Sequence, residues 1–285
     1  MFEENKKSLN VFREAKKSEI ARLEALSQNG GGLEAALRLK PKNRPGFLAA
    51  LREGRKKRGL GVIAEYKRAS PSLGDINLTL TPEEAALAYR AADACSALTE
   101  EKFFKGSLSF VPPLADRGKP VLRKDFIFHR LQVVQTAETP ASALLLIVGL
   151  TPDPLVLEDL RLEAESFGLE AVVEVFSAEE LDLARRSGAK LIQFNSRNLN
   201  NLKVDNSACL ELAMTCPPQA DEFYVAASGM KTGRDLFLAA QAGFGAVLIG
   251  TFLMSSANPA ESLAKLEKEF LSLRATESLA NSPAR

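Results

Sequence analysis

The sequence predicts a (β/α)8 barrel of the TIM-barrel class, preceded by a helical N-terminal extension. From residue 62 onward, short apolar runs alternate with helical segments eight times, which favours a parallel sheet covered by helices. Eight such units within about 200 residues leave no gap for a domain boundary, so a closed barrel is favoured over an open doubly wound sheet. A length of 285 residues and an apolar fraction of 46% suit one large core.

Residues 1–58 are expected to form the helical extension, packed on the barrel rather than folded alone. Apolar residues recur at helical spacing over Phe2–Leu26, and the polar, glycine-rich run that starts at Gln28 breaks the pattern. A second short helix is expected over Leu33–Leu39 and a third over Phe47–Lys57. The extension has too little apolar surface to form a core of its own.

The barrel is expected to occupy residues 59–275, followed by a polar tail over residues 276–285. Thr81 is placed as an N-cap, with Pro82 in the first turn of the helix after the first strand. The expected strands are short and apolar: Val62–Tyr66, Ala94–Leu98, Pro120–Leu122, Ala143–Val148, Ala171–Val175, Leu191–Phe194, Tyr224–Ala227 and Ala246–Ile249. The expected helical segments start at Pro82 and lie over Ser107–Arg117, Arg130–Glu138, Pro154–Phe167, Ala178–Ser187, Ser207–Met214, Thr232–Ala242 and Pro259–Leu273.

Composition argues against several classes of function. The formal net charge is +1, so neither nucleic acid nor an anionic membrane is indicated as a partner. No apolar run could span a bilayer, and the first residues lack the apolar core of a signal peptide. Three scattered cysteines fit a reducing cytoplasm, and a single histidine argues against a histidine-based metal centre or a Ser-His-Asp triad. Acid–base chemistry would then fall to carboxylates and lysines, with no metal.

The first strand ends in Glu65 and Lys67, which should project the same way because side chains along a strand alternate in direction. An isolated pair of this kind is more often a structural ion pair. In a barrel, however, active sites form at the C-terminal ends of the strands. Other strands bring polar residues to that mouth: Arg123-Lys124-Asp125 on the third, Glu174 on the fifth and Asn195-Ser196-Arg197-Asn198 on the sixth. Glu174 is the least expected of these, because a buried parallel strand should be apolar throughout.

The ends of the last two strands carry a second signal. Ser228-Gly229 follows the seventh strand and Gly250-Thr251 follows the eighth, so both loops offer backbone N–H groups without bulky side chains. Barrel phosphate sites commonly form from these two loops and a short helix. Each pair alone is weak evidence, but together they predict a phosphorylated small-molecule ligand.

Six collinear stretches also resemble the signatures of a known family. They are Ile63–Ser72, Leu98–Ser107, Val121–Phe126, Glu174 within Val-Val-Glu-Val, Asn195–Leu199 and Leu248–Met254. The first is similar to the I-K-R-A-S-P-S signature of the indole-3-glycerol-phosphate synthase family, and the others follow in that family's order. The resemblance covers about residues 45–260 and also fits the helical extension.

The resemblance implies a reaction and a set of roles. The family decarboxylates and ring-closes 1-(2-carboxyphenylamino)-1-deoxyribulose 5-phosphate to indole-3-glycerol phosphate, without a metal or a cofactor. Lys124 would be the general acid for ring closure, and Glu174 the base or acid for the later dehydration. Glu65 would share in proton transfer, Lys67 would neutralise the phosphate or the leaving carboxylate, and Asn195 would orient a substrate hydroxyl.

The resemblance also implies how the substrate is held. The phosphate would lie on the backbone around Ser228, Gly229, Gly250 and Thr251, helped by Lys67. The residues implied for the ring pocket and for orientation are Ser70, Pro71, Phe104, Phe126, Leu145, Arg197 and Leu199. For the apolar members of this set, ordinary core packing is an equally good interpretation. In a dry pocket of this kind, a lysine among other cations is expected to have a lowered pKa, and a carboxylate a raised one.

Three features depart from the family pattern. Ala227 stands where the family has a glutamate, so one carboxylate that would face the site is missing. The second strand lies about two residues closer to the preceding helix than in the family, so either its register shifts or that helix ends early. Gln193 stands where the family has glycine.

The sequence leaves several rival functions open. The same barrel could be a degenerate, non-catalytic form that binds a phosphorylated ligand. A phosphoribosylanthranilate isomerase would need a cysteine and an aspartate at strand ends, which Cys95 in mid-strand fits poorly. A purely structural barrel fused to other enzymes would show an extra domain or linker. We expect a monomer in the cytoplasm that could associate with other enzymes of tryptophan synthesis.

Overall fold

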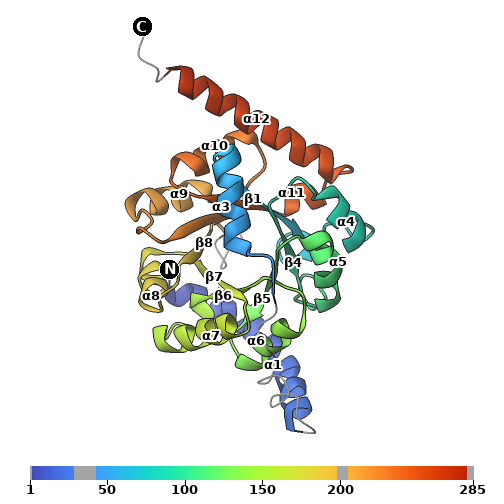
Figure 1. Cartoon of the computed structure of the whole chain (residues 1–285). Coiled ribbons are helices and arrows are strands. Elements are labelled where there is room, and N and C mark those ends of the chain that lie inside the picture. The colour runs from blue at the N-terminus through green and yellow to red at the C-terminus, as the bar shows by residue number, and fades with distance from the viewer. Residues whose placement is uncertain (1, 29–42, 198–204, 281–285) are drawn as a thin grey trace.

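The computed structural model describes residues 2–28, 43–197 and 205–280, and it is built around a closed barrel of eight parallel strands (Figure 1). The barrel strands are β1 Gly61–Tyr66, β4 Ala94–Leu98, β5 Val121–Ile127, β6 Ala143–Ile147, β7 Glu170–Val175, β8 Leu191–Asn195, β9 Phe223–Ala227 and β10 Ala246–Ile249. Each strand pairs with the next in the chain, and β10 closes the ring on β1. The predicted TIM-barrel fold is confirmed.

Helices surround this ring. They are α1 Phe2–Gln28, α3 Phe47–Arg58, α4 Pro82–Ala88, α5 Val111–Ala115, α6 Arg130–Glu138, α7 Pro154–Ser166, α8 Ala178–Arg186, α9 Asn206–Thr215, α10 Gly233–Gln241, α11 Thr251–Met254 and α12 Pro259–Ala280. Single 3-10 turns lie at Leu108–Phe110, Asp116–Gly118 and Val148–Leu150, and a small hairpin pairs Ala69–Ser70 with Gly74–Asp75. Among the described residues no helix is long and apolar enough to cross a bilayer. The helix expected over Leu33–Leu39 lies outside the described residues.

The predicted start of α4 is confirmed. Thr81 caps the helix by accepting a hydrogen bond from the backbone N–H of Glu84, and the Glu84 carboxylate accepts one from the N–H of Thr81 at 2.8 Å. Pro82 lies in the first turn, where a missing N–H breaks no helical bond. This reciprocal capping box fixes the chain as it leaves the loop above β1.

The short spacing before the second barrel strand is absorbed by the helix. β4 pairs in regular register with both β1 and β5, from Ile63 opposite Ala94 to Leu98 opposite Lys124. The preceding helix, α4, has only seven residues. Of the two outcomes that the sequence allowed, the structure shows the early end of the helix. A register shift would have displaced the strand against both of its neighbours in the barrel, whereas shortening a helix on the outside disturbs little packing.

Three elements differ clearly from those expected. The helical segment expected over Ser107–Arg117 is divided into a 3-10 turn, the short helix α5 and a second 3-10 turn. The third barrel strand was predicted over Pro120–Leu122, but β5 continues through three charged residues to Ile127. The apolar pattern could not reveal this, because the charged side chains have buried polar partners. The last helix runs to Ala280 rather than to Leu273, so it extends into the segment that was expected to be a tail.

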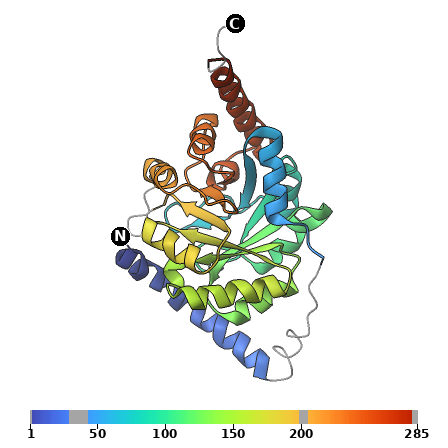
Figure 2. The same ribbon diagram turned by 60° about the vertical axis from the view of Figure 1, so that its left-hand side comes forward.

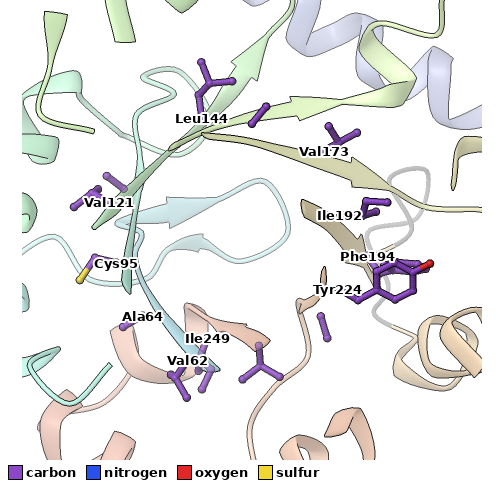
Figure 3. Close-up of a cluster of buried hydrophobic side chains, with 14 of the residues drawn as sticks. Val62, Ala64, Cys95, Val121, Leu144, Val173, Ile192, Phe194, Tyr224 and Ile249 are labelled. Atoms are coloured by element: carbon purple, nitrogen blue, oxygen red, sulfur yellow. The ribbon is translucent and has the colours of Figure 1, made fainter. Parts of the chain in front are cut away.

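Strand alternation divides the core into two layers. Outward side chains such as Val62 and Ala64 pack under the surrounding helices, and Figure 3 shows a ring of such side chains around the strands. The next residue along β1, Ile63, belongs instead to the cluster that fills the barrel interior. The barrel is therefore packed through its centre, and a cavity opens at its C-terminal mouth.

The N-terminal extension contributes to both ends of the barrel. Phe47 and Leu51 of α3 belong to the interior cluster. At the start of β7, the Glu170 carboxylate accepts hydrogen bonds from two backbone N–H groups in the first turn of α3. Leu9 and Phe12 of α1 join the same cluster at the opposite end. Figures 1 and 2 show α1 and α12 on opposite sides of the barrel. One helix of the extension thus closes the floor, and the other reaches the mouth.

Candidate active site

A cavity of about 410 Å³ opens at the C-terminal ends of the barrel strands. All the residues to which the family resemblance assigned a role, and which the structure describes, line it: Glu65, Lys67, Ser70, Pro71, Phe104, Lys124, Phe126, Leu145, Glu174, Asn195, Arg197, Ser228, Gly229, Gly250 and Thr251. Leu199 lies outside the described residues. Residues from strands far apart in the sequence therefore converge on one site, as the barrel topology requires.

Glu65 is the centre of charge in this cavity. Its Oε1 lies 3.1 Å from Nζ of Lys67, and its Oε2 lies 3.3 Å from Nζ of Lys124 on β5. A side chain on Gly250 would collide with the Glu65 carboxylate, so the glycine at the end of β10 makes room for it. Glu65 and Lys67 are therefore more than a simple structural ion pair, because the carboxylate is buried and bridges two ammonium groups.

The pKa directions in this trio differ from those that the sequence led us to expect. Burial disfavours the charged form of Glu65, but the two ammonium groups outweigh it and hold the pKa of Glu65 below its ordinary value. Burial likewise opposes the charge on Lys124, yet the carboxylates of Glu65 and Glu174 keep the pKa of Lys124 above its ordinary value. The expectation of a lowered lysine pKa and a raised carboxylate pKa is wrong for these two groups. It matches Lys67 alone, where burial dominates and lowers the pKa.

Glu174 enters the cavity from β7 with a different kind of partner. Its Oε2 accepts a hydrogen bond from the side-chain amide of Gln193, which lies opposite it on β8. Glu174 is only 3% exposed, although it lines the cavity. Ala227, on the next strand, is fully buried in the apolar interior cluster. The carboxylate that the family pattern would place at position 227 is thus replaced by a methyl group in the packed interior.

The loops after β9 and β10 form the polar end of the cavity. Ser228 has a φ of 72°, which is unusual for a residue with a side chain, and its Oγ donates a 2.8 Å hydrogen bond to Oδ1 of Asn195. Gly229 follows with a φ of 77°. Strained backbone of this kind is held by its surroundings and clusters at ligand sites. Lys231, an exposed cation, lines the cavity at the same end.

Asn195 and Arg197 close the side of the cavity next to β8. Oδ1 of Asn195 accepts a second hydrogen bond, of 3.0 Å, from the backbone N–H of Arg197. Because both bonds engage the oxygen, the amide nitrogen of Asn195 is the group that can donate to a ligand. The guanidinium of Arg197 donates to Oγ of Ser72 at 3.0 Å, which joins this side to the loop above β1.

Aromatic rings form the apolar wall. Phe126 stacks on Phe12 of α1, with ring centroids 4.1 Å apart and planes 12° apart. Phe103 packs edge-on against Phe12 at 5.1 Å, and Phe104 lies 6.2 Å from Phe126. The first helix of the extension therefore supplies part of the wall against which a flat aromatic ligand could pack.

A buried network of charged residues connects α1 to the barrel beside this wall. Nζ of Lys16 lies 2.6 Å from Asp125 and 2.6 Å from Glu19, and its side chain is only 4% exposed. Asp125 also accepts a 2.6 Å hydrogen bond from the hydroxyl of Thr99 and lies 3.3 Å from the guanidinium of Arg123. Arg123, expected at the mouth, instead bonds to this network and to the helix that follows, α6. It therefore has a structural role.

Several residues of the cavity were missed by sequence reasoning. They are Leu9, Phe12, Ser72, Leu73, Leu98, Ile147, Met230, Lys231, Leu248 and Phe252. Leu9 and Phe12 come from the extension, whose docking site on the barrel no local pattern reveals. Lys231 could have been found, since it follows Ser228-Gly229 in a predicted phosphate loop. No group of three or more His, Cys, Asp or Glu side chains in the described part of the chain could hold a metal ion.

Comparisons with known proteins bear on the family to which this chain belongs. Residues 9–266 match the model of the family described as indole-3-glycerol phosphate synthase. The chain is 40% identical over 210 residues to the enzyme of that name from Streptococcus mutans, covering 73% of this chain and 81% of the relative. It is 39% identical over 261 residues to that of Mycobacterium sp. strain KMS, covering 90% of this chain and 93% of the relative.

Solved structures show the same fold at low sequence identity. A 3-hexulose-6-phosphate synthase from Salmonella typhimurium superposes with a TM-score of 0.57 at 14% identity, covering 75% of this chain and 99% of that one. A tryptophan synthase alpha subunit from Legionella pneumophila gives 0.53 at 14% identity, covering 80% of this chain and 96% of that one. These likenesses concern the fold alone, whereas the family match extends over residues 9–266 and so includes most of α1. The chain belongs to the indole-3-glycerol phosphate synthase family.

Proposed function

We propose that the protein is a carboxy-lyase of tryptophan biosynthesis, converting 1-(2-carboxyphenylamino)-1-deoxy-D-ribulose 5-phosphate to indole-3-glycerol phosphate, CO2 and water. Family membership and the sequence identity of about 40% to synthases along most of the chain support this activity. The geometry supports it independently, because one cavity combines an aromatic wall, a proton-transfer group and two glycine-containing loops suited to phosphate.

The observation that carries the proposal is the environment of Lys124. Its ammonium group lies 3.3 Å from Glu65 in a buried site, and the two nearby carboxylates raise its pKa. Lys124 therefore stays protonated at neutral pH and can act as a general acid. A half-buried, charged lysine that faces an open cavity is costly to maintain unless it has a task there.

Ring closure is the first step. The ring carbon that bears the substrate carboxylate attacks the ketone carbon, and the ketone oxygen takes a proton from Lys124 as the C–C bond forms. The bond to the carboxylate then breaks, its electron pair restores the aromatic ring, and CO2 leaves. Lys67, whose pKa is lowered by burial, lies on the other side of Glu65 and can neutralise the carboxylate or the phosphate before the reaction.

Dehydration is the second step. The new hydroxyl must leave as water, which needs one proton, and the indoline ring must lose one proton to become indole. We assign this proton transfer chiefly to Glu174, because its carboxylate is held by the neutral amide of Gln193. Glu65 is ion-paired with two ammonium groups, which makes it a weaker base. It serves mainly to hold Lys67 and Lys124 in place and to transfer protons from one lysine to the other.

The remaining residues hold the substrate at both ends. Phosphate would lie against the backbone at Ser228-Gly229 and Gly250-Thr251, with Lys67 and Lys231 as cations near it. The anthranilate ring would lie along the wall that includes Phe126, and the amide nitrogen of Asn195 would donate to a hydroxyl of the ribulose chain. Ser70, Pro71, Phe104, Leu145 and Arg197 complete this lining. These steps need no metal or cofactor.

A fluorescence assay tests the proposal, because the indole product absorbs and emits differently from the anthranilate substrate. Purified, folded protein should convert the substrate with multiple turnovers. Absence of product from folded protein would contradict the proposal.

A degenerate, non-catalytic barrel is the rival function that Ala227 motivates, since this residue removes one carboxylate from the interior. A degenerate barrel would bind the phosphorylated substrate without turnover, and Ala227→Glu would restore a large activity. We expect turnover in the wild type and little change in the variant, since the charged groups around Lys124 are all in place.

Neither an isomerase nor a purely structural barrel receives support from the site. Cys95, which an isomerase mechanism would need at the mouth, packs in the layer between strands and helices, and burial raises its pKa to about 12. A purely structural barrel would not need charged groups around an open cavity. Cytoplasmic location, a monomeric state and loose association with other enzymes of the pathway stay predictions, and light scattering on purified protein tests the monomer.

A further inference from the structure

Gln193 is a buried polar residue to which the mechanism above assigns no role of its own. It lies in the middle of β8 with no exposed surface, on the inward face of the barrel. Its Nε2 donates a hydrogen bond to Oε2 of Glu174, and its Oε1 has no hydrogen-bond partner in the described part of the chain. Gln193 does not line the cavity, whereas Glu174 does. The amide therefore lies behind the carboxylate, on the side away from the ligand.

The surroundings of Gln193 are otherwise apolar. Its register partner on β9 is Val225, and two residues before it on the same face is Leu191. Both belong to the interior cluster, as do Val172 on β7 and Ala227 on β9. Among these neighbours, Glu174 is the polar group that Gln193 bonds. An apolar side chain of similar size would fill the same space and would remove the unpaired Oε1, but it would also take the donor away from the buried Oε2 of Glu174.

The contribution of glutamine to stability at this position is therefore mixed, because the hydrogen bond that it makes is offset by a buried acceptor without a partner. Its buried Oε1 opposes folding, and the single bond that it gains goes to the carboxylate proposed to carry protons during dehydration. Buried polar groups that bond a reacting side chain from behind fix the orientation of that side chain. With Oε2 bound to the amide, Oε1 of Glu174 is the oxygen left available to a ligand.

We propose that Gln193 is a positioning residue that orients the carboxylate of Glu174 for proton transfer. The proposal rests on the synthase activity proposed above. It does not require Gln193 to touch substrate, and it assigns to β8 a second contribution to the site in addition to Asn195. Loss of the amide should slow the chemical step and leave substrate binding unchanged, because the ring and phosphate contacts lie elsewhere in the cavity.

The test compares Gln193→Met with the wild type. Methionine matches the length and flexibility of glutamine but cannot donate to Glu174. We expect kcat to fall about tenfold, the scale seen when an outer partner of an active-site group is lost, with KM within twofold. The thermal unfolding midpoint should change little, because the loss of the unpaired Oε1 offsets the loss of the bond to Glu174. Gln193→Glu, which sets a like charge against Glu174, should lower kcat further. Wild-type kcat in either folded variant would overturn the proposal.

Two comparisons separate positioning from general packing. Leu191→Met makes a change of similar size on the same strand and face without touching Glu174, and its kcat should equal that of the wild type. In a Glu174→Gln background, Gln193→Met should cause no further loss, because the amide acts through the carboxylate. Equal losses in both backgrounds, or a loss in Leu191→Met as large as in Gln193→Met, would assign the effect to packing.

Failure of the proposal for Gln193 can be distinguished from failure of the proposed synthase activity. If the wild type itself forms no indole product, the synthase proposal fails and the kinetic comparison cannot be made. If the wild type turns over and Gln193→Met keeps its kcat, only the role of Gln193 is overturned.

Discussion

A carboxylate between two ammonium groups sets the charge of this site. Glu65 alone, at the end of a strand, could be an ordinary ion-pair partner. In the barrel it holds Lys67 at 3.1 Å and Lys124 at 3.3 Å, and the two lysines respond differently. The pKa of Lys124 is raised, because two carboxylates outweigh the effect of burial. The pKa of Lys67 is lowered, because burial outweighs the ion pair with Glu65. This difference supports the proposed role of Lys124 as the acid and makes Lys67 the more easily neutralised cation.

Removal of Lys124 should abolish most of the turnover and leave the fold intact. Loss of one positioned acid typically lowers a rate by about 10²–10⁴-fold, so we expect kcat of Lys124→Ala to fall within that range. Steady-state fluorescence kinetics and circular dichroism measure the two effects. Lys190→Ala is a matched control, because Lys190 is exposed beside the start of β8, at the other end of the barrel. Near-normal turnover of Lys124→Ala would move the acid role to Lys67.

The lowered pKa of Glu65 makes a prediction about stability. The folded state favours the ionised carboxylate, so Glu65 contributes stability that is fully present above its ordinary pKa of 4.5 and is lost as pH falls through the lower folded value. The free energy of unfolding should therefore differ most between wild type and Glu65→Gln above pH 4.5, and the difference should shrink below it. Urea unfolding at a series of pH values measures this. A difference that grows toward acid pH would show the opposite shift.

Lys231 gives a test of the phosphate end. Its side chain is exposed and lines the cavity beside Ser228-Gly229, so its contribution should be to binding and not to the chemical step. An exposed ion pair is worth up to about 1 kcal/mol, so Lys231→Ala should raise KM up to about fivefold with kcat unchanged. Added salt should reduce the difference in KM between wild type and Lys231→Ala, because it screens exposed charges. A fall in kcat at constant KM would place Lys231 in the chemistry instead.

At the scale of elements, α1 joins the site through charge as well as through apolar contact. Phe12 stacks on Phe126 in the cavity wall, and Lys16 reaches Asp125, the residue next to Lys124 on β5. A helix that looks like an appendage in the sequence thus shares a buried network with the strand that carries the proposed acid.

The network predicts that two adjacent lysines of α1 contribute very differently to the free energy of unfolding. Lys16→Met removes the partner of a buried carboxylate, which typically costs about 3–5 kcal/mol; we expect about 3 kcal/mol, because Arg123 and Thr99 still bond Asp125. Lys17→Met removes an exposed pair with Glu14 and should cost less than about 1 kcal/mol. Urea unfolding of both variants makes the comparison. Equal losses would mean that α1 is held by its apolar contacts alone.

For the whole molecule, the order of strands and helices could be predicted from the sequence because parallel barrel strands are short, apolar and regularly spaced. The residues at their C-terminal ends could be placed in one cavity for the same reason, since the barrel brings those ends together. Thus Glu65, Lys124 and Glu174 were expected near one another without any knowledge of distances. Family signatures then added the substrate.

Features that depend on contacts between distant elements could not be predicted in this way. The docking of α1 on β5 requires the match between Lys16 and Asp125, which no local pattern contains. The directions of the pKa shifts depend on whether burial or a particular ion pair is stronger, and this is decided by the distances of 3.1 and 3.3 Å around Glu65. The bond from Gln193 to Glu174 likewise follows from strand register, which sets one residue opposite the other.

The most direct test of the proposed activity is turnover of the substrate labelled with ¹³C in its carboxylate. Purified wild-type protein should release labelled CO2 and indole-3-glycerol phosphate in equal amounts over many turnovers, and Lys124→Ala should release both at a rate about 10²–10⁴-fold lower. Folded wild-type protein that binds the substrate but releases neither product would contradict the proposed activity.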